Sequence, residues 1–418
     1  MMRISIVSAD NKNGGASRAT RRIVKGLTEN SIQNKIFYEF ICNGEPEIGY
    51  FLRKPIYKWY VKYLYKNSKI RPIAKSIINK LWQKLNLIEF KKGCLFYRLG
   101  NSLNYKKTFK NSDLIHIFWG QTFIDPVKIM GLNKPTIITL HDMWFITGGF
   151  AYTDNPENDK RTYLTWIGRK NYENQLAKKI KLLNCTNTKI VVTSNWMANK
   201  VLEAGFKENK ITKILNYVPR NFKFLNEREK CKELLGWSIN AKSKKIIYFS
   251  GSLTDPRKGF NYLLESIKKL SDDIKSKIAV QILGHKFDKI QPLDKLNIEY
   301  NCLGIFSDEL SQIIAYNSSD ILICPSSIDN TPNVIAEAQM CGLPCVALEG
   351  TGASEMIEIG LSGFVTSKNN IHDLADFISN FAIDKFQFDS LKISELARKK
   401  YSIDNTCNKY LELYKSIL

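Results

Sequence analysis

The stretch from residue 320 to residue 365 constrains the fold of this 418-residue chain more than any other. It begins with a four-residue apolar run, 321–324, which is too short for a helix and is stopped by Pro325, so it predicts a buried strand. Residues 329–331 are types that cap helices, and Pro332 fits the first position of a helix that ends at Gly342. A second buried strand fits residues 345–348. This alternation indicates an α/β fold with parallel strands.

Two carboxylates stand out in this stretch. Asp329 lies in the loop at the carboxyl end of the first strand, and Glu337 lies eight residues later, on the helical face shared by Val334 and Cys341. The helix macrodipole favours an acid near a helix N-terminus by roughly 0.3–1 kcal/mol. That effect accounts for Asp329 well and for Glu337 poorly. We therefore expect a functional role for Glu337 and, by a smaller margin, for Asp329.

The rest of the chain carries further short, β-branched runs that predict strands. The length is sufficient for two domains of ordinary size, each with its own core. We expect an N-terminal domain at residues 1–218 and a C-terminal domain at residues 219–402. The predicted strands are residues 3–9, 113–119, 136–140, 189–193 and 211–219 in the first domain, and 245–251, 278–284, 298–303, 321–324 and 345–348 in the second.

Several polar or glycine-rich loops follow these strands at their carboxyl ends, where open α/β sheets bind ligands. Gly14 and Gly15 precede a helix and suit the approach of an anion, although tight turns use glycine anyway. His141 opens the loop after residues 136–140, with Asp142 and Trp144 behind it; a structural role for His141 remains the alternative.

Loops of the second half carry the clearest anion-binding pattern. Arg257 and Lys258 stand at a helix N-terminus after the strand 245–251, and two cations beside such a site suit a diphosphate. The alternative is a solvated pair of charges. Gly352 and Ala353 belong to a small-residue loop suited to backbone contact with a sugar or phosphate.

Residues 51–92 form a basic segment with a single acid, Glu89. Its lysines follow one helical face, while Trp59, Tyr60 and Tyr63 follow another, a pattern that suits an anionic membrane surface. A solvated helical insertion that packs on the domain is an equally good interpretation. The whole chain has a net charge of +22, which indicates an anionic partner. No nucleic-acid-binding motif accompanies the charge, so we expect no nucleic-acid partner.

The nine cysteines are odd in number and irregularly spaced, which favours reduced thiols. No His or Cys cluster completes a metal site, so we expect no bound metal. The N-terminus does not resemble a signal peptide, and no segment approaches the ~20 apolar residues that span a bilayer. We expect a cytoplasmic protein, either free or peripheral on the inner face of the membrane.

The spacing of Asp329 and Glu337, followed by Cys341-Gly342-x-Pro344, resembles the donor-site signature of family-4 retaining glycosyltransferases. The similarity is closest to the branch that builds bacterial surface polysaccharides such as capsule, O-antigen and colanic acid. This resemblance implies the GT-B fold, in which two Rossmann-like parallel-sheet domains face each other across a cleft. It also implies an acceptor-side first domain, a donor-binding second domain, and a C-terminal helix, residues 403–418, that packs back on the first.

The resemblance implies a reaction as well. A sugar would move from a nucleotide diphosphate donor, UDP- or GDP-linked, to a hydroxyl of a lipid-linked saccharide, with retention and without a metal or cofactor. Lys258 would hold the diphosphate; Ser252 replaces the family's arginine, and Arg257 would substitute for it. The resemblance assigns the remaining residues as follows: Glu337 to the donor ribose, Asp329 to a sugar hydroxyl, His141 to orienting sugar or acceptor, Gly14, Gly15, Asn333, Val334, Gly352 and Ala353 to the donor, and Asp142, Trp144 and His116 to the acceptor side.

Two other functions remain open from the sequence. A GT-B sugar-nucleotide epimerase would use the same donor site without an acceptor. A non-catalytic basic binding or scaffold protein would retain the fold but turn over no nucleotide sugar.

Overall fold

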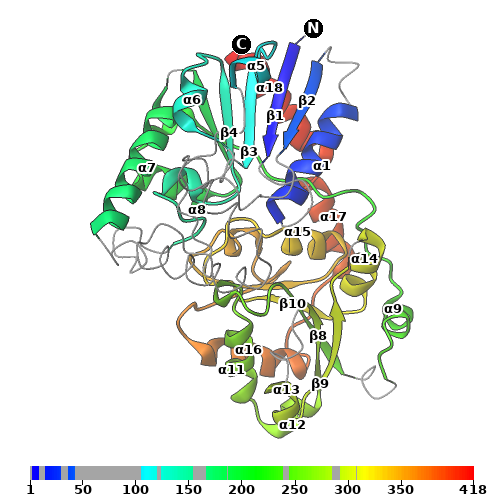
Figure 1. The fold of residues 1–418 in the computed structure, drawn as a ribbon. Coiled ribbons are helices and arrows are strands. Elements are labelled where there is room, and N and C mark those ends of the chain that lie inside the picture. Colours follow the sequence, from blue (N-terminus) through cyan, green and yellow to red (C-terminus); the bar gives the residue numbers. More distant parts are fainter. Residues whose placement is uncertain are drawn as a thin grey trace, which may run out of the picture. The chain divides into compact units, whose positions relative to one another are not determined.

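The computed structural model is shown in Figure 1. It describes residues 2–8, 15–29, 36–42, 105–119, 124–153, 166–185, 187–238, 244–284, 292–306 and 308–418. The chain divides into two compact units. The first comprises residues 1–193, 197–214 and 407–418, and the second comprises residues 194–196 and 215–406.

The first unit is built on a six-stranded, wholly parallel sheet with strand order β2-β1-β3-β4-β5-β6. Strands and helices alternate along the chain of this unit, and α1 is the next element after β1 (Figure 1). The strands are β1 (Met2–Ser8), β2 (Ile36–Cys42), β3 (Leu114–Trp119), β4 (Thr136–Leu140), β5 (Thr188–Val192) and β6 (Ile211–Lys213), and the helices are α1 (Gly15–Glu29), α5 (Tyr105–Thr108), α6 (Pro126–Met130), α7 (Trp166–Asn184) and α8 (Asn195–Glu203).

The C-terminal helix α18 (Ile403–Ile417) packs on the sheet of the first unit through a buried polar network. Nδ1 of His116 on β3 lies 2.8 Å from the Tyr414 hydroxyl, and Nε2 lies 2.9 Å from the hydroxyl of Thr139 on β4. The Thr139 hydroxyl lies 3.2 Å from that of Tyr410, one turn earlier on α18. Because both ring nitrogens of His116 have partners, its complete burial costs little in lost hydrogen bonding.

The second unit contains another six-stranded parallel sheet, with strand order β12-β11-β10-β7-β8-β9. Figure 1 shows helices on both faces of it. Its strands are β7 (Lys245–Ser250), β8 (Ile278–Leu283), β9 (Glu299–Gly304), β10 (Ile321–Cys324), β11 (Cys345–Leu348) and β12 (Gly363–Thr366), and its helices are α9 (Arg228–Leu234), α11 (Phe260–Lys268), α12 (Asp272–Ser276), α13 (Pro292–Lys295), α14 (Glu309–Asn317), α15 (Asn333–Met340), α16 (Ile371–Ala382) and α17 (Ser390–Lys400).

Successive residues of these strands face opposite sides of the sheet and form two separate cores. On β7, Ile247 and Phe249 join a core with residues of α11 and α16, whereas Tyr248 joins a core with residues of α14, α15 and α17. On β10, Ile321 and Leu322 divide in the same way. Burial on both faces explains why the strands read as continuous apolar runs in the sequence.

The structure confirms the ten predicted strands within one residue at most ends and adds two that were not predicted, β2 and β12. One predicted strand and one predicted helix need correction. The strand predicted at 211–219 covers only Ile211–Lys213, because the chain leaves the sheet there to enter the second unit. Pro332 is the N-cap of α15, so the helix begins at Asn333, one residue later than predicted. The side chain of Asp329 is held by cations instead of capping this helix.

Residues 51–92 lie outside the described part of the chain. Within that part, no helix combines the length and the apolar character needed to cross a bilayer. No disulfide joins the cysteines among the described residues.

Candidate functional site

The strand order of the second unit reverses between β7 and β10, which are neighbours in the sheet. At such a switch point, the loops that leave the two strands diverge to opposite faces and open a crevice at the carboxyl edge of the sheet. The loop after β7 runs from Gly251 to Gly259, and the loop after β10 runs from Pro325 to Pro332. These two loops carry the cations and the carboxylate that the sequence singles out.

The loop after β7 is shaped by two local features. Asp255 caps the short helical turn Pro256–Lys258, because its carboxylate accepts a hydrogen bond of 3.0 Å from the Arg257 backbone N–H. Gly259 then adopts φ +75°, and a Cβ atom there would lie 1.9 Å from the Pro325 carbonyl oxygen. The glycine therefore lets this loop lie directly against the loop that follows β10.

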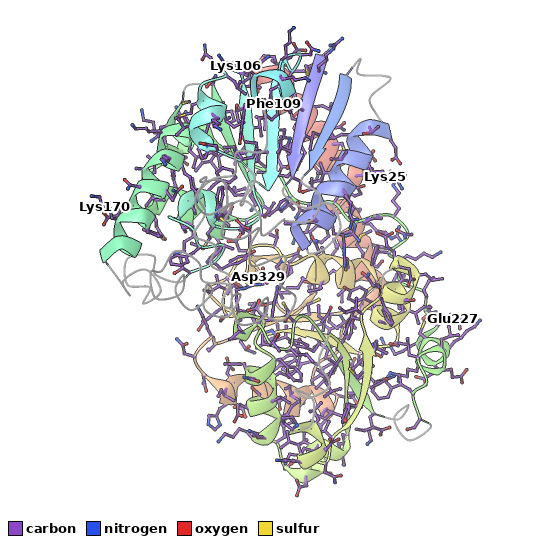
Figure 2. All side chains as sticks on the ribbon, viewed as in Figure 1. Lys25, Lys106, Phe109, Lys170, Glu227 and Asp329 are labelled. Carbon is purple, nitrogen blue, oxygen red and sulfur yellow. The ribbon has the colours of Figure 1, made fainter. Side chains whose placement is uncertain are left out.

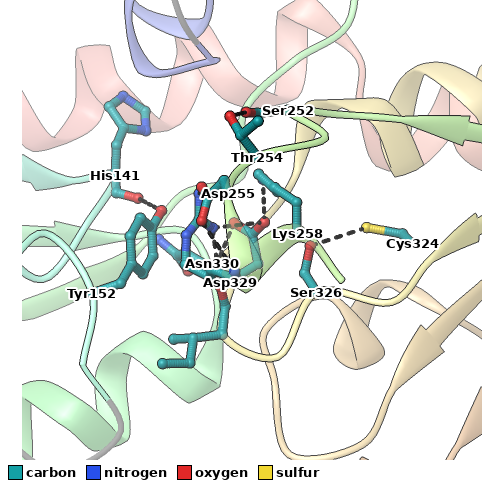
Figure 3. Close-up of polar contacts among 12 residues, drawn as sticks. His141, Tyr152, Ser252, Thr254, Asp255, Lys258, Cys324, Ser326, Asp329 and Asn330 are labelled. Atoms are coloured by element: carbon teal, nitrogen blue, oxygen red, sulfur yellow. Dashed lines mark hydrogen bonds and ion pairs between the residues drawn. The ribbon is translucent and has the colours of Figure 1, made fainter. Parts of the chain in front are cut away.

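Arg257, Lys258 and Asp329 form one ion-pair cluster (Figure 3). Lys258 Nζ lies 2.6 Å from Asp329 Oδ2, and Arg257 donates to the same oxygen at 3.2 Å. Arg257 also contacts Asp255 Oδ2 at 3.1 Å and the carbonyl of Ile328 at 3.0 Å. The structure therefore brings together residues that lie about 70 positions apart in the sequence.

The environment of Asp329 favours its ionised form. Burial alone would raise the pKa of this carboxyl group, but the charges of Lys258 and Arg257 and their hydrogen bonds lower the pKa below its ordinary value. With Asp255 included, two cations face two carboxylates, so the cluster is close to neutral. A diphosphate that binds these cations must share them with Asp329.

The loop after β11 completes this edge of the sheet. The Gly352 N–H donates to the Asp329 carbonyl at 2.9 Å, and a Cβ atom on Gly352 would lie 2.0 Å from the Asn330 carbonyl oxygen. Ala353, the next residue, is fully buried. Asn333 and Val334, the first residues of α15, are half-buried beside these loops. The structure thus gathers most of the predicted donor-side residues on one edge.

Glu337 lies one turn into α15 and is fully buried. Its Oε2 accepts a hydrogen bond of 2.8 Å from the hydroxyl of Tyr316 on α14. Burial, together with the nearby Glu337 carboxylate, raises the pKa of Tyr316 well above its ordinary value, so this hydroxyl remains a donor. A ribose hydroxyl can reach Glu337 only if the side chains that cover the carboxylate move.

The predicted acceptor-side loop of the first unit begins directly after β4. His141 accepts a hydrogen bond of 3.1 Å on its carbonyl from the Tyr152 hydroxyl (Figure 3), and burial lowers the pKa of its imidazole to about 4. Asp142 accepts from the Trp144 N–H at 2.9 Å. Both His141 and Asp142 are half-buried, whereas Trp144 is only 2% exposed and packs inside the unit.

Two further predicted residues have other outcomes. His116 occupies the middle of β3 and is enclosed by Thr139 and Tyr414, which gives it a packing role in place of the expected contact with an acceptor. Gly14 lies outside the described residues. Gly15 is the first residue of α1 and is exposed.

Three residues at or near these loops were not predicted. Asp255 and Tyr316 gain their importance from partners that sequence spacing does not reveal. Lys179, which contacts the loop after β4, does carry a signal. It occupies the apolar stripe of α7 formed by Tyr172, Leu176 and Leu183, where a lysine is unexpected.

Within the described ranges, no group of three or more His, Cys, Asp and Glu side chains is placed to hold a metal ion.

Comparison with known proteins finds a family model that matches most of the second unit. Residues 235–400 match the family model of the glycosyl transferases group 1. A Klebsiella pneumoniae protein described as an uncharacterized 41.2 kDa protein in the cps region is 26% identical, and the alignment covers 70% of this chain and 82% of that protein.

Two relatives with assigned activities are similar to about half of the chain. The capsular polysaccharide biosynthesis glycosyltransferase CapM of Staphylococcus aureus is 25% identical over 50% of this chain and 56% of its own length. The N,N'-diacetylbacillosaminyl-diphospho-undecaprenol alpha-1,3-N-acetylgalactosaminyltransferase of Campylobacter jejuni is 27% identical over 51% of this chain and 56% of its own length.

The structure of Anabaena HepE in complex with UDP superposes with a TM-score of 0.66, at 17% identity, and the alignment covers 99% of this chain and all of that one. The likeness extends over both units and shows a common fold. The chain therefore has the GT-B fold, and its residues 235–400 match the glycosyl transferases group 1 family model.

Proposed function

We propose that this protein is a glycosyltransferase that moves a sugar from a nucleoside diphosphate donor, UDP- or GDP-linked, to a hydroxyl of a lipid-linked saccharide in the synthesis of a bacterial surface polysaccharide. The observation that carries the proposal is the cluster of Lys258, Arg257 and Asp329 at the switch point of the second unit. The names of CapM and of the Campylobacter enzyme support the acceptor class, and the UDP complex of HepE supports the donor class.

In this proposal the cations of the loop after β7 bind the donor diphosphate. Lys258 and Arg257 stabilise the negative charge that accumulates on the diphosphate as it leaves, and such fixed charges are worth more in a partly buried site than in water. The first-turn N–H groups of α11 have no partner within the helix and add to the same field. Arg257 supplies the charge that Ser252 lacks.

The remaining donor contacts come from α15 and the loop after β11. Backbone contacts to the donor come from Asn333, Val334, Gly352 and Ala353. Asp329 binds a sugar hydroxyl through the part of its carboxylate that Lys258 and Arg257 do not contact. Glu337 binds the ribose after a local movement. Gly14 and Gly15 contribute N–H groups at the start of α1.

In the first unit, His141 orients the sugar or the acceptor hydroxyl, with Asp142 beside it. Its low pKa keeps the imidazole neutral at pH 7, so it acts as a hydrogen-bonding group without charge. Trp144 and His116 support this side of the site from inside the unit. We assign no general base to the chain; the departing phosphate accepts the proton of the acceptor hydroxyl.

The reaction is proposed to retain the anomeric configuration and to need no metal. Release of nucleoside diphosphate from a panel of UDP- and GDP-sugars, measured with EDTA and with or without a lipid-linked acceptor extract, tests these points. We expect release that depends on the acceptor and occurs with one donor. The new linkage, determined by NMR, should have the same anomeric configuration as the donor sugar. Isomerisation of the donor without an acceptor would instead identify an epimerase. A protein that neither turns over nor binds any nucleotide sugar would be a non-catalytic scaffold.

We also propose that the protein binds anionic membranes through residues 51–92. Exposed lysines elsewhere on the first unit, including Lys25, Lys106 and Lys170, add positive charge to it (Figure 2). Each basic residue near an anionic surface contributes about 1 kcal/mol. Sedimentation with phosphatidylglycerol vesicles should therefore be strong at low salt and lost when the basic residues between 53 and 84 are replaced by glutamine. Equal sedimentation of that variant would show that another surface binds.

A further inference from the structure

A buried lysine lies beneath the loop that follows β4. Lys179, on α7, is 1% exposed, and its Nζ donates to the carbonyl oxygens of Trp144 at 2.7 Å and of Thr147 at 3.0 Å. The same ammonium lies 3.6 Å from the centroid of the Trp144 ring. One side chain therefore binds this loop at two backbone positions and one aromatic face.

The rest of the loop leaves little freedom around these contacts. The Thr147 hydroxyl donates to the Phe150 carbonyl at 2.6 Å and accepts from the Phe150 N–H at 2.9 Å. Gly148 lies so close to Tyr172 of α7 that a Cβ atom would stand 2.2 Å from the ring. The segment from Trp144 to Phe150 is thus fixed against α7, with Lys179 at its centre.

An ammonium is a costly choice for this position. Burial lowers the pKa of Lys179 well below its ordinary value, and the charge of Asp142 acts in the opposite direction. Burial of a charged group is unfavourable unless the group is paired or hydrogen-bonded, so an apolar side chain would fill this space at a lower desolvation cost. What a lysine adds is directional hydrogen bonding that selects one loop conformation.

The state of Trp144 indicates what the lysine holds in place. Its indole N–H is buried and has no hydrogen-bond partner among the described residues, although buried donors are nearly always paired. The ring is therefore positioned by its face on Lys179 and by Phe145, at a centroid distance of 4.9 Å, and not by its polar edge. The Asp142 carboxylate accepts from the backbone N–H of Trp144, which links the main chain of this residue to the strand end.

We propose that Lys179 is a positioning residue for the acceptor. By holding the Trp144 and Thr147 carbonyls and the Trp144 ring, it keeps the loop after β4 in the conformation in which His141 and Asp142 meet the acceptor saccharide. The inference rests on the proposed function, because the acceptor role of this loop belongs to it. It predicts that Lys179 affects transfer to the acceptor and leaves nucleotide binding alone.

The first test separates these two steps. Lys179→Met keeps an unbranched side chain one heavy atom shorter and removes the charge. Lys181→Met changes an exposed lysine of the same helix and is the matched control. For Lys179→Met we expect transfer to fall about 10- to 100-fold, the usual cost of misplacing a reacting group by about 1 Å. Its affinity for UDP or GDP and its slow acceptor-independent hydrolysis of the donor should match those of the wild type and of Lys181→Met.

Undiminished transfer by Lys179→Met, or an equal loss of transfer and of acceptor-independent hydrolysis, would overturn the proposal. The second outcome is what general destabilisation would produce. Absence of transfer in the wild type with every donor would contradict the proposed function itself, and it would leave a second measurement to decide the role of Lys179.

That measurement uses the wild-type protein labelled with ¹³C-lysine. Because Lys179 lies over the Trp144 ring, its ε-methylene signal should be displaced strongly upfield, and comparison with Lys179→Met assigns it. If that variant does not fold, the size of the upfield displacement assigns the signal. Among the described lysines that lie over an aromatic ring, Lys179 is 3.6 Å from the ring centroid and the others are 5.5–5.9 Å away. We expect acceptor oligosaccharide to shift this signal and UDP alone to leave it unchanged. A signal that responds to UDP alone, or to neither, would refute the positioning role.

Discussion

Asp329 is held by the two cations that we assign to the donor diphosphate. From this contact we predict that removal of the Asp329 charge strengthens diphosphate binding. Lys258 Nζ and Arg257 both lie within 3.2 Å of one carboxylate oxygen. If a phosphate oxygen binds Lys258 on its other side, it stands about 5 Å from the carboxylate, given ordinary hydrogen-bond lengths. Asp329 then repels the ligand while it positions the cation. Asp329→Asn, which keeps the shape of the side chain and removes its charge, should therefore bind nucleoside diphosphate more tightly.

The magnitude follows from the distances. Two unit charges 5 Å apart interact by about 3 kcal/mol at an effective dielectric constant of 20. Loss of the ion pair frees the Lys258 side chain, whereas Arg257 keeps its contacts with Asp255 and the Ile328 carbonyl. Ordering Lys258 again on binding costs about 0.5–1.5 kcal/mol. The net gain should be about 1.5–2.5 kcal/mol, which is a decrease of about 10- to 70-fold in Kd. Turnover should fall, because Asp329 no longer fixes the cations or meets the sugar.

Isothermal titration with UDP, GDP and inorganic pyrophosphate measures this effect. Asp272→Asn is a suitable control, because Asp272 is fully exposed and pairs with Lys275 in the same unit; its affinity should equal that of the wild type. If Asp329→Asn folds normally and binds all three ligands no more tightly than the wild type, the cations do not hold the diphosphate in the way we describe.

Two other perturbations test the packing around the site and the two histidines whose pKa is lowered. Gly352→Ala places a methyl group where only 2.0 Å separates it from the Asn330 carbonyl, so it should displace the loop that holds Asp329 and reduce turnover while the second unit stays folded by circular dichroism; wild-type turnover would show that the loop tolerates the shift. Burial lowers the pKa of His116 well below 6.5 and that of His141 to about 4, so the unfolded chain takes up protons that the folded chain does not. Stability should be complete above about pH 6.5 and should fall as the pH drops towards 4, by up to about 1.4 kcal/mol per pH unit for each histidine. Thermal unfolding of the wild type and of His116→Gln between pH 7.5 and 5 measures this, and equal pH dependence of the two would contradict it.

The sequence predicts ten of the twelve described strands, because these are short apolar runs that end in proline, glycine or a polar loop; β2 and β12 were not predicted. Residues 321–324 and 345–348 match β10 and β11 at both ends. The predicted strand at 211–219 fails because its later residues enter the second unit, a change of partner that local hydrophobicity does not report. The start of α15 lies one residue later than predicted, because Pro332 has the extended backbone of an N-cap and no side chain caps the helix.

The sequence predicts which residues lie together at this edge better than it predicts their contacts. Strand-end position places Lys258, Asp329 and Gly352 at one edge of the sheet, because all parallel strands present their carboxyl ends there. The pairing of Lys258 with Asp329 depends on the neighbouring positions of β7 and β10 in the sheet, which sequence order does not give. His116 is a residue that the sequence suggests for a ligand contact and that the structure buries. A histidine within a strand reads as a candidate ligand contact until α18 is seen to enclose it with Tyr414.

The central claim is that a nucleoside diphosphate binds at the cation cluster of the second unit. Titration of UDP and GDP into the wild type, Lys258→Met and Lys268→Met tests it most directly. Lys268 is half-exposed and pairs with Glu265 on α11, so it matches Lys258 in charge but lies away from the cluster. We predict that Lys258→Met loses about 1.5–3 kcal/mol of binding free energy, the contribution of a charged hydrogen bond, and that Lys268→Met binds like the wild type. Equal affinity in all three proteins would contradict the account.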